Sequence, residues 1–202
     1  MADKRDKTII IKKFAESYLS SLTNLDVVNK PFFIFFSALH GSGKTTLGKT
    51  LAEDLGAVLI GVDEIKMMMS EQGYTRDEYY PLIRPIFHQV WNEIIDNKSN
   101  KLVIFDLGID QWFDDKEGFF QRAKSRKIPY YLIRISLTVE EAKKRVALRG
   151  REDSHITLNQ LDDVNEAFQK CKAKLSADFN YNGDPDYNNL LNDIRLKMKD
   201  NI

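Results

Sequence analysis

The residues that first point to chemistry are two glycines and the lysine and threonine that follow them. The segment "ALHGSGKTT" covers residues 38–46 and contains Gly41, Gly43, Lys44 and Thr45. Glycine lets consecutive backbone N–H groups curl around an oxyanion, because it carries no side chain and accepts positive φ angles. A lysine beside such a loop supplies a cation, and a threonine hydroxyl can bind a divalent metal ion. The spacing therefore predicts a loop that binds phosphate groups.

The elements on either side of this loop have the composition that this chemistry requires. Residues 32–36 are consecutive large apolar side chains, which is typical of a strand buried on both faces of a parallel sheet. A helix is predicted from Lys44, since leucines recur at every fourth position over residues 47–55. The helix would add its positive amino-terminal end to the same anion. In this context the segment fits the P-loop pattern, with Ala38 at the first glycine position; an ordinary glycine turn is the less favoured alternative.

The P-loop pattern assigns a role to most positions of the segment. Lys44 would reach the β- and γ-phosphates and assist their transfer, and the Thr45 hydroxyl would bind Mg²⁺. His40 occupies a variable position of the loop. The residues predicted to surround a bound nucleoside triphosphate are His40, Gly41, Ser42, Gly43, Lys44, Thr45 and Thr46.

Two acidic residues follow other predicted strands. Asp63 lies just past a short strand at residues 57–60, and Asp106 ends a buried strand at residues 102–105. Because strand ends on one edge of a parallel sheet line the ligand crevice, both carboxylates should face the phosphates. Asp63 could accept a proton from an acceptor hydroxyl, although an Asp before "EIK" would also suit a helix N-cap. Asp106 could hold Mg²⁺ directly or through water, or simply start a loop.

Two arginines form a third group of candidates. In "KKRVALRGRED", residues 143–153, Arg145 and Arg149 are four positions apart and share one face of a predicted helix. Converging arginines stabilise charge on a transferring phosphoryl group, and a guanidinium can stack on a base. A solvated basic helix face is the competing interpretation.

The composition bounds the class of protein. The chain has 202 residues, of which 43% are hydrophobic, enough for one domain with a substantial core. Lys plus Arg and Asp plus Glu number 30 each, so no net charge favours general binding to nucleic acid or to membranes. The single cysteine excludes an internal disulfide and suits a reducing compartment.

The amino end predicts neither a signal peptide nor a membrane anchor. Its apolar run at residues 9–11 is interrupted by Lys12 and Lys13, far short of a secretory h-region. No stretch of the sequence is long enough to span a bilayer. We therefore expect a cytoplasmic protein with no membrane partner and no obligate protein partner.

Residues 1–30 are predicted to form an amphipathic helix ahead of the main domain at residues 31–202. Apolar side chains recur at helical spacing between residues 7 and 25, among them Phe14 and Tyr18. This helix would pack on its own domain or bind a partner. Packing within the chain is favoured, because amphipathic helices usually bury their apolar stripe locally.

Strands and helices alternate along the main domain. Thr75 and Glu78 form a capping box, but Pro81 and Pro85 predict that the continuous helix starts only near Pro85. After residue 179 we expect a loop and a peripheral helical element. The predicted strands are residues 32–36, 57–60, 102–105 and 130–136. The alternation indicates an α/β fold, a parallel sheet with helices on both faces.

With these residues in view, the chain resembles the small P-loop kinases of the nucleotide-kinase-like branch over about residues 32–175. The group includes zeta-toxin-like kinases, the polynucleotide 5'-kinase domain, chloramphenicol phosphotransferase and gluconate kinase. The resemblance rests on "ALHGSGKTT", on "VDEIK" after the second strand and on the two arginines of "KKRVALR". It implies a three-layer P-loop fold with a five-stranded parallel sheet and a short helical lid at about residues 145–160.

The resemblance also implies roles for individual residues. Asp63 would be the catalytic base, Arg145 would lie near the adenine, and Arg149 would lie near the phosphates and assist catalysis. ATP and Mg²⁺ would be bound. Lys66 stands where the family often has an arginine that contacts the acceptor, and Val62 replaces the usual serine. These two departures leave the identity of the acceptor open.

The sequence as a whole predicts an ATP- and Mg²⁺-dependent kinase that transfers the γ-phosphate to a hydroxyl of a small molecule or nucleotide-like acceptor. Nucleic acid would serve only as a 5'-end substrate. The alternative is a non-catalytic ATP-binding regulator or a simple ATPase, with Asp63 acting only as a helix cap. A GTPase switch is less favoured, because no Asn-Lys-x-Asp element follows a plausible strand.

Overall fold

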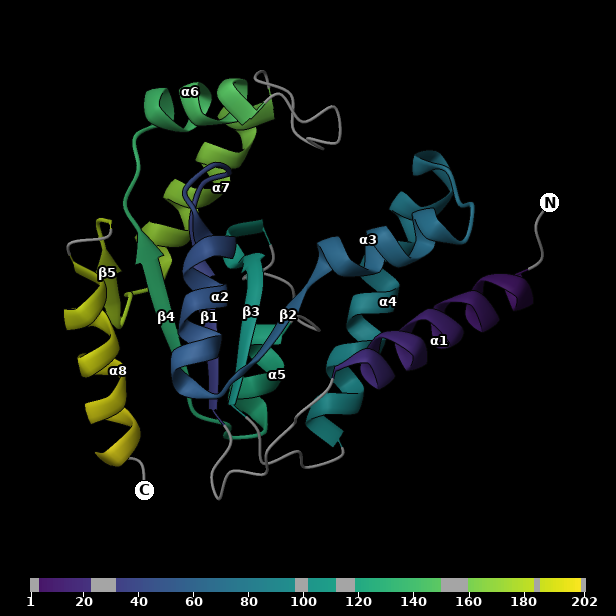
Figure 1. Ribbon diagram of the computed structural model, residues 1–202, viewed down its shortest axis with the longest axis horizontal. Helices are drawn as coiled ribbons and strands as arrows, with labels where there is room; N and C mark the ends of the chain where they lie inside the picture. The colour runs from purple at the N-terminus through teal and green to yellow at the C-terminus, as the bar shows by residue number, and fades with distance from the viewer. Residues whose placement is uncertain are drawn as a thin grey trace.

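The computed structural model describes residues 4–22, 32–96, 102–111, 119–149, 160–183 and 186–200. Its centre is a five-stranded sheet with the strand order β2-β3-β1-β4-β5. All neighbouring strands run parallel. The strands are β1 (Phe32–Ser37), β2 (Val58–Gly61), β3 (Leu102–Gly108), β4 (Tyr130–Ile135) and β5 (Phe179–Tyr181). The predicted parallel α/β sheet is confirmed (Figure 1).

Helices cover both faces of this sheet (Figure 1). One face carries α1, α3, α4 and α5, and the other carries α2 and α8. The helices are α1 (Lys4–Ser21), α2 (Lys44–Leu55), α3 (Val62–Glu71), α4 (Arg76–Asp96), α5 (Phe119–Ser125), α6 (Val139–Arg149), α7 (Gln160–Lys174) and α8 (Tyr187–Asp200), with a 3-10 turn η1 (Ile109–Gln111) after β3. No helix among these described ranges is long and apolar enough to cross a membrane.

The large apolar run of β1 fills two separate cores. Side chains of a strand alternate between the faces of the sheet, so Phe33 and Phe35 pack in the core under α4, while Ile34 and Phe36 pack in the core under α2. Trp91 of α4 contacts the rings of both phenylalanines in the first core. Burial on both faces explains why this strand has no polar residue before Ser37.

The helix at the amino end begins and ends earlier than predicted. It covers Lys4–Ser21, and Leu22 follows it without helical structure. Phe14, Ala15 and Tyr18 are buried in the same core as α3 and α4. The preference for packing within the chain is therefore confirmed. Leu25 of the predicted helix lies outside the described residues.

The predicted start of the helix near Pro85 is wrong. Helix α4 runs without interruption from Arg76 to Asp96 and contains both Pro81 and Pro85. Both prolines are exposed, so water can satisfy the carbonyls that lose an N–H partner. The Thr75–Glu78 capping box does form, because the Thr75 N–H and hydroxyl both donate to Glu78 Oε2 at 2.8 Å.

The end of the domain also differs from expectation. The segment after residue 178 is not a loop but strand β5, Phe179–Tyr181. Asp178 holds it in place, because its carboxylate accepts a hydrogen bond from the Leu132 N–H at 2.8 Å. Helix α8 is not peripheral either, since Leu190, Leu191 and Ile194 are buried in the core beside α2.

Candidate functional site

The loop between β1 and α2 has the backbone that phosphate binding requires. Gly41 and Gly43 have φ angles of 82° and 90°, which residues with side chains rarely adopt. Gly43 is the N-cap of α2 and no side chain caps this helix start. The first N–H groups of α2 are therefore available for an anion, and the helix dipole favours negative charge there. This arrangement suits the phosphates of a nucleotide.

The loop also contacts the region predicted to act as a lid. A side chain at Gly41 would lie 3.2 Å from the Ala142 carbonyl and 3.2 Å from Val146 Cγ2, both in α6. Figure 1 shows α6 beyond the carboxyl ends of the strands. The Cβ of Arg145 lies 3.5 Å from the same position. The structure thus brings the backbone of Arg145 over the loop, while its side chain is exposed.

The other lid residues are only partly described. Arg149 is the last residue of α6, and nothing is described of its side chain. Residues 150–159 of the predicted lid lie outside the described residues. The predicted roles of Arg145 and Arg149 remain predictions.

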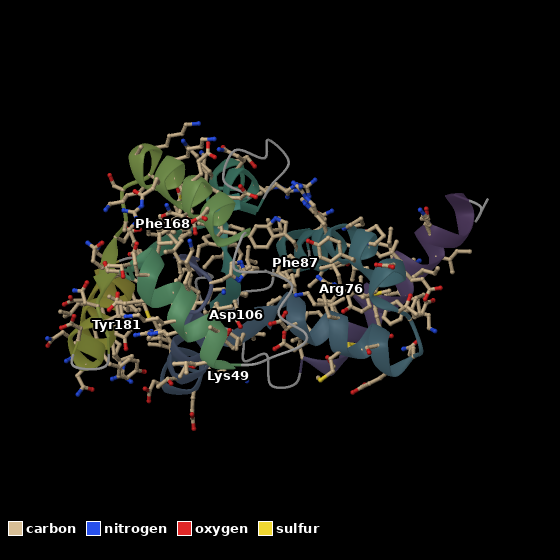
Figure 2. The ribbon with its side chains drawn as sticks, turned by 90° about the horizontal axis from the view of Figure 1, so that it is seen from above. Lys49, Arg76, Phe87, Asp106, Phe168 and Tyr181 are labelled. Atoms are coloured by element: carbon tan, nitrogen blue, oxygen red, sulfur yellow. The ribbon has the colours of Figure 1, made fainter. Side chains whose placement is uncertain are left out.

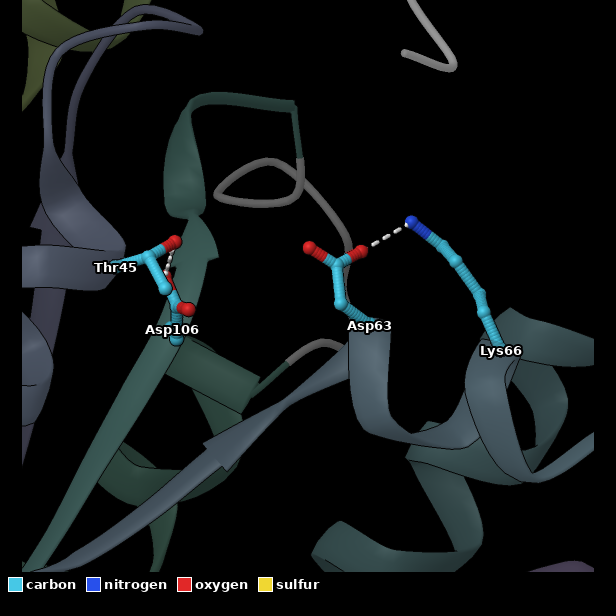
Figure 3. A network of polar contacts seen from close by, with 4 residues as sticks. All are labelled: Thr45, Asp63, Lys66 and Asp106. Carbon is cyan, nitrogen blue, oxygen red and sulfur yellow. Dashed lines mark hydrogen bonds and ion pairs between the residues drawn. The ribbon is translucent and has the colours of Figure 1, made fainter. Parts of the chain in front are cut away.

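Thr45 and Asp106, which are both predicted to hold Mg²⁺, lie in contact. The Thr45 hydroxyl donates a hydrogen bond to Asp106 Oδ1 at 3.1 Å (Figure 3). In the view from above, Asp106 lies between Tyr181 of β5 and Arg76 of α4 (Figure 2). It is 8% exposed, and burial raises its pKa, partly offset by the Lys44 charge and the Thr45 hydrogen bond. Asp106 is not the end of β3, which continues to Gly108.

Asp63 lies at the end of the neighbouring strand and is not a helix cap. Gly61 is the N-cap of α3, and Asp63 falls in the first turn. The Asp63 side chain is 71% exposed, and its Oδ1 lies 2.6 Å from Lys66 Nζ. Figure 3 shows this ion pair at the same edge of the sheet as Thr45 and Asp106. Gly61, not Asp63, therefore stands at the N-cap of α3, and the role of Asp63 as a base stays a prediction.

Glu64 is a site residue that sequence reasoning missed. Its Oε2 is buried and lacks a hydrogen-bond partner among the described residues. A side chain at Gly61 would lie 2.6 Å from this oxygen and 3.5 Å from Asp106 Cβ, so the carboxylate folds back toward Asp106. Burial raises the pKa of Glu64, and the charges of Asp106 and Asp63 raise it further. The sequence signal that points to Glu64 is its position directly after Asp63, at the start of a helix.

These residues fit a magnesium ion. Mg²⁺ is usually held by one or two carboxylates together with water and substrate phosphates. The described residues contain no cluster of three or more His, Cys, Asp or Glu side chains that could hold a metal alone. They do offer Asp106 with the Thr45 hydroxyl beside the phosphate loop, and the unpartnered Glu64 oxygen next to Gly61.

Asp110 is a second residue that the sequence analysis missed. It is 3% exposed and accepts hydrogen bonds from the Ser37 hydroxyl at 2.7 Å and from the Ala38 N–H at 2.8 Å. Burial raises its pKa. Arg134 donates from β4 to Ser37 Oγ at 3.4 Å. Ser37 and Ala38 are where β1 passes into the loop, so Asp110 fixes the start of the loop.

Cys171 adjoins this buried polar group. It is fully buried and free, and burial followed by the Asp110 charge raises its pKa to about 12. Its place in the core is consistent with a structural role for this cysteine.

The fold and the loop define a P-loop domain that binds nucleoside triphosphates. The family model of the AAA domain matches residues 34–171, and the chain belongs to this family. Among curated proteins, none matches this chain.

Three of the solved structures with a similar fold are named as kinases. Shikimate kinase from Aquifex aeolicus vf5 is 20% identical, with a TM-score of 0.50 over 84% of this chain and 97% of that chain. Shikimate kinase from Acinetobacter baumannii in complex with shikimate is 17% identical, with a TM-score of 0.53 over 86% and 95%. A candidate kinase from Chloroflexus aurantiacus j-10-fl is 16% identical, with a TM-score of 0.61 over 83% and 98%. These similarities confirm the P-loop kinase fold.

Proposed function

We propose that this protein is an ATP-dependent kinase that transfers the γ-phosphate to a hydroxyl of a small molecule or nucleotide-like acceptor. The observation that carries the proposal is the placement of Asp63. It is exposed, does not cap its helix, and lies at the same strand edge as the Thr45–Asp106 pair. A nucleotide regulator would not need a carboxylate there, whereas a kinase needs a proton acceptor beside the γ-phosphate.

Each residue then has a chemical role. The N–H groups of the loop and Lys44 bind the phosphates, and Asp63 accepts the proton of the acceptor hydroxyl as its oxygen bonds to the γ-phosphorus. The bond from that phosphorus to the β–γ bridging oxygen breaks, and ADP leaves. Lys66 orients Asp63 through the 2.6 Å ion pair. Mg²⁺, held by Asp106, Thr45 and Glu64, would neutralise charge on the β- and γ-phosphates.

The remaining assignments belong to the same proposal. Arg145 and Arg149 would close over the nucleotide from α6, since Arg145 already lies beside Gly41. Residues 31–202 would form the kinase domain, with the lid at about 145–160. Cytoplasmic ATP would supply the phosphoryl donor. The similarity in fold to shikimate kinases favours a small hydroxylated acceptor over a macromolecule for this protein.

The test uses γ-labelled ATP, Mg²⁺ and a panel of acceptors: sugars, hydroxy acids, nucleosides and 5'-hydroxyl oligonucleotides. Wild type, Asp63→Asn and Asp77→Asn are compared, because Asp77 is another exposed aspartate in the first turn of a helix. We expect one acceptor to be labelled, with Asp63→Asn slower by about 10²–10⁴-fold. ATP affinity should be unchanged in both variants, and Asp77→Asn should keep full activity.

The other outcomes contradict parts of the proposal. Full transfer by Asp63→Asn would show that Asp63 is not the base. Label released only as free phosphate would indicate an ATPase. Tight ATP binding with no turnover would favour the regulatory alternative.

A further inference from the structure

The backbone N–H of Gly61 is bound by a side chain from a distant part of the chain. It donates a hydrogen bond to the Tyr18 hydroxyl of α1 at 3.0 Å. β2 is the edge strand of the sheet, so no strand of the described ranges lies on its outer side. Buried backbone N–H groups need partners, and at the last residue of β2 Tyr18 provides that partner.

Packing fixes Tyr18 in this place. Phe14 and Tyr18 are 1% and 2% exposed, and the Phe14 ring contacts the edge of Tyr74 at 5.5 Å between centroids. Helix α1 packs against α3 and α4 and lies beyond β2 in Figure 1. The family model matches residues 34–171, so α1 lies outside the matched residues.

Gly61 also stands at the start of the helix that carries two acidic residues of the site. It is the N-cap of α3, whose first turn contains Asp63 and Glu64. Its Cα faces Glu64 Oε2 so closely that an added Cβ would lie 2.6 Å away. A displacement of Gly61 would therefore move both carboxylates relative to Asp106.

The Tyr18 hydroxyl is suited to a permanent structural contact. Burial raises its pKa well above the ordinary value of tyrosine, and the charges of Glu64 and Asp106 raise it further, against the opposing effect of the Gly61 hydrogen bond. It stays protonated and neutral at physiological pH. Beside two acids, a neutral hydroxyl adds no negative charge.

We propose that Tyr18 is a positioning residue: through it, α1 holds the N-cap of α3 and sets the place of Asp63 relative to the Thr45–Asp106 pair. The part of this inference that concerns turnover rests on the proposed kinase function. The part that concerns the start of α3 does not depend on that function.

The experiment compares wild type, Tyr18→Phe and Phe14→Leu. Tyr18→Phe removes only the hydroxyl, whereas Phe14→Leu loosens the packing of α1 and leaves the hydroxyl in place. Amide hydrogen exchange is followed at residues 61–64, together with the melting temperature. Turnover is measured with the acceptor found in the labelled-ATP panel, or with water as the acceptor. ATP affinity is measured by equilibrium titration.

We expect Tyr18→Phe to lower kcat by about tenfold or more, because small displacements of catalytic groups have large kinetic effects. The KM for ATP should stay within about twofold of wild type, since the phosphate loop is untouched. Exchange at residues 61–64 should accelerate by about tenfold, as expected for a lost buried hydrogen bond. Phe14→Leu should lower the melting temperature and leave kcat near that of wild type.

The proposal is overturned if Tyr18→Phe keeps the exchange rates of residues 61–64. It is also overturned if Phe14→Leu reduces kcat as much as Tyr18→Phe at equal loss of stability, because general loosening would then explain the effect. If the wild type transfers no phosphate at all, the kinase function fails. Accelerated exchange at residues 61–64 in Tyr18→Phe would then still support the hold on the N-cap.

Discussion

Replacing Asp110 by Ala tests whether the start of the phosphate loop is held from η1. The change leaves the Ser37 hydroxyl and the Ala38 N–H without the acceptor that each has at 2.7 and 2.8 Å. The Ser37 hydroxyl can rotate toward another acceptor, but the backbone N–H of Ala38 cannot. Leaving such a buried donor unpaired costs about 1–3 kcal/mol. The lost hydrogen bond of Ser37 adds about 1 kcal/mol, for a sum of roughly 3 kcal/mol.

This loss should be visible in two measurements. For a chain of this length, about 3 kcal/mol lowers the melting temperature by roughly 6–12 °C. Because Ala38 begins the loop, ATP affinity should also fall. The fall is about tenfold if the ATP-bound protein loses roughly 1.4 kcal/mol more than the unbound protein. Thermal unfolding and a calorimetric ATP titration check these values.

Asp110→Asn is the matched control. Its carbonyl oxygen can still accept from the Ala38 N–H, and its amide can donate to Ser37 Oγ. Because burial raises the pKa of Asp110, the buried negative charge itself is unfavourable, and its removal should cost little. The reasoning is refuted if Asp110→Ala leaves both stability and ATP affinity unchanged. It is also refuted if Asp110→Asn is as damaging as Asp110→Ala, since charge rather than hydrogen bonding would then be decisive.

Other variants test the neighbouring contacts. Asp106→Asn should abolish Mg²⁺-dependent ATP binding yet raise the melting temperature of the unliganded protein by a few degrees; a lowered melting temperature in a thermal scan without nucleotide would contradict this. The physical reason is that burial raises the pKa of Asp106, so the folded state disfavours its ionised form. For the same reason, the folded state of the unliganded wild type binds a proton at Asp106 more tightly than the unfolded state does. Its stability should therefore rise as the pH falls from the folded pKa of Asp106 toward the ordinary aspartate value. Urea unfolding of Asp106→Asn should lack this rise. Gly41→Ala should weaken ATP binding by about tenfold, because an alanine at φ 82° is strained by roughly 1–2 kcal/mol and its Cβ would press on the Ala142 carbonyl at 3.2 Å. An equilibrium titration with unchanged affinity would show that the loop accommodates a side chain.

The parts of the site that the sequence predicts are those with a local cause. The phosphate loop needs glycines at positive φ between a strand and a helix, and both conditions are visible within residues 32–55. Asp63 and Asp106 are found because each lies at or near a predicted strand end, and parallel strands bring their ends to one edge. The Thr45–Asp106 hydrogen bond joins residues that are 61 positions apart, yet the topology alone brings them together.

The parts that the sequence does not predict depend on contacts without a local pattern. Tyr18 matches the apolar stripe of an amphipathic helix, and nothing nearby shows that its hydroxyl binds a backbone group 43 residues away. Asp110 binds Ala38 across 72 residues and lies in a turn whose sequence resembles any loop. Strand β5 has only three residues, too few for a periodic signal, and its pairing depends on Asp178.

These missed residues share a physical origin. Ala38 lies just past the end of β1, and Gly61 lies in the edge strand β2, so the buried N–H of each residue is satisfied by a side chain instead of a strand. Asp110 satisfies the N–H of Ala38 and Tyr18 satisfies the N–H of Gly61. The first contact comes from within the matched family region, and the second comes from a helix outside it. The nucleotide side is therefore held from within the matched residues, whereas the side that carries Asp63 is held by a helix outside them. If the acceptor differs from those of other P-loop kinases, α1 and the helices it supports are where the difference should be sought.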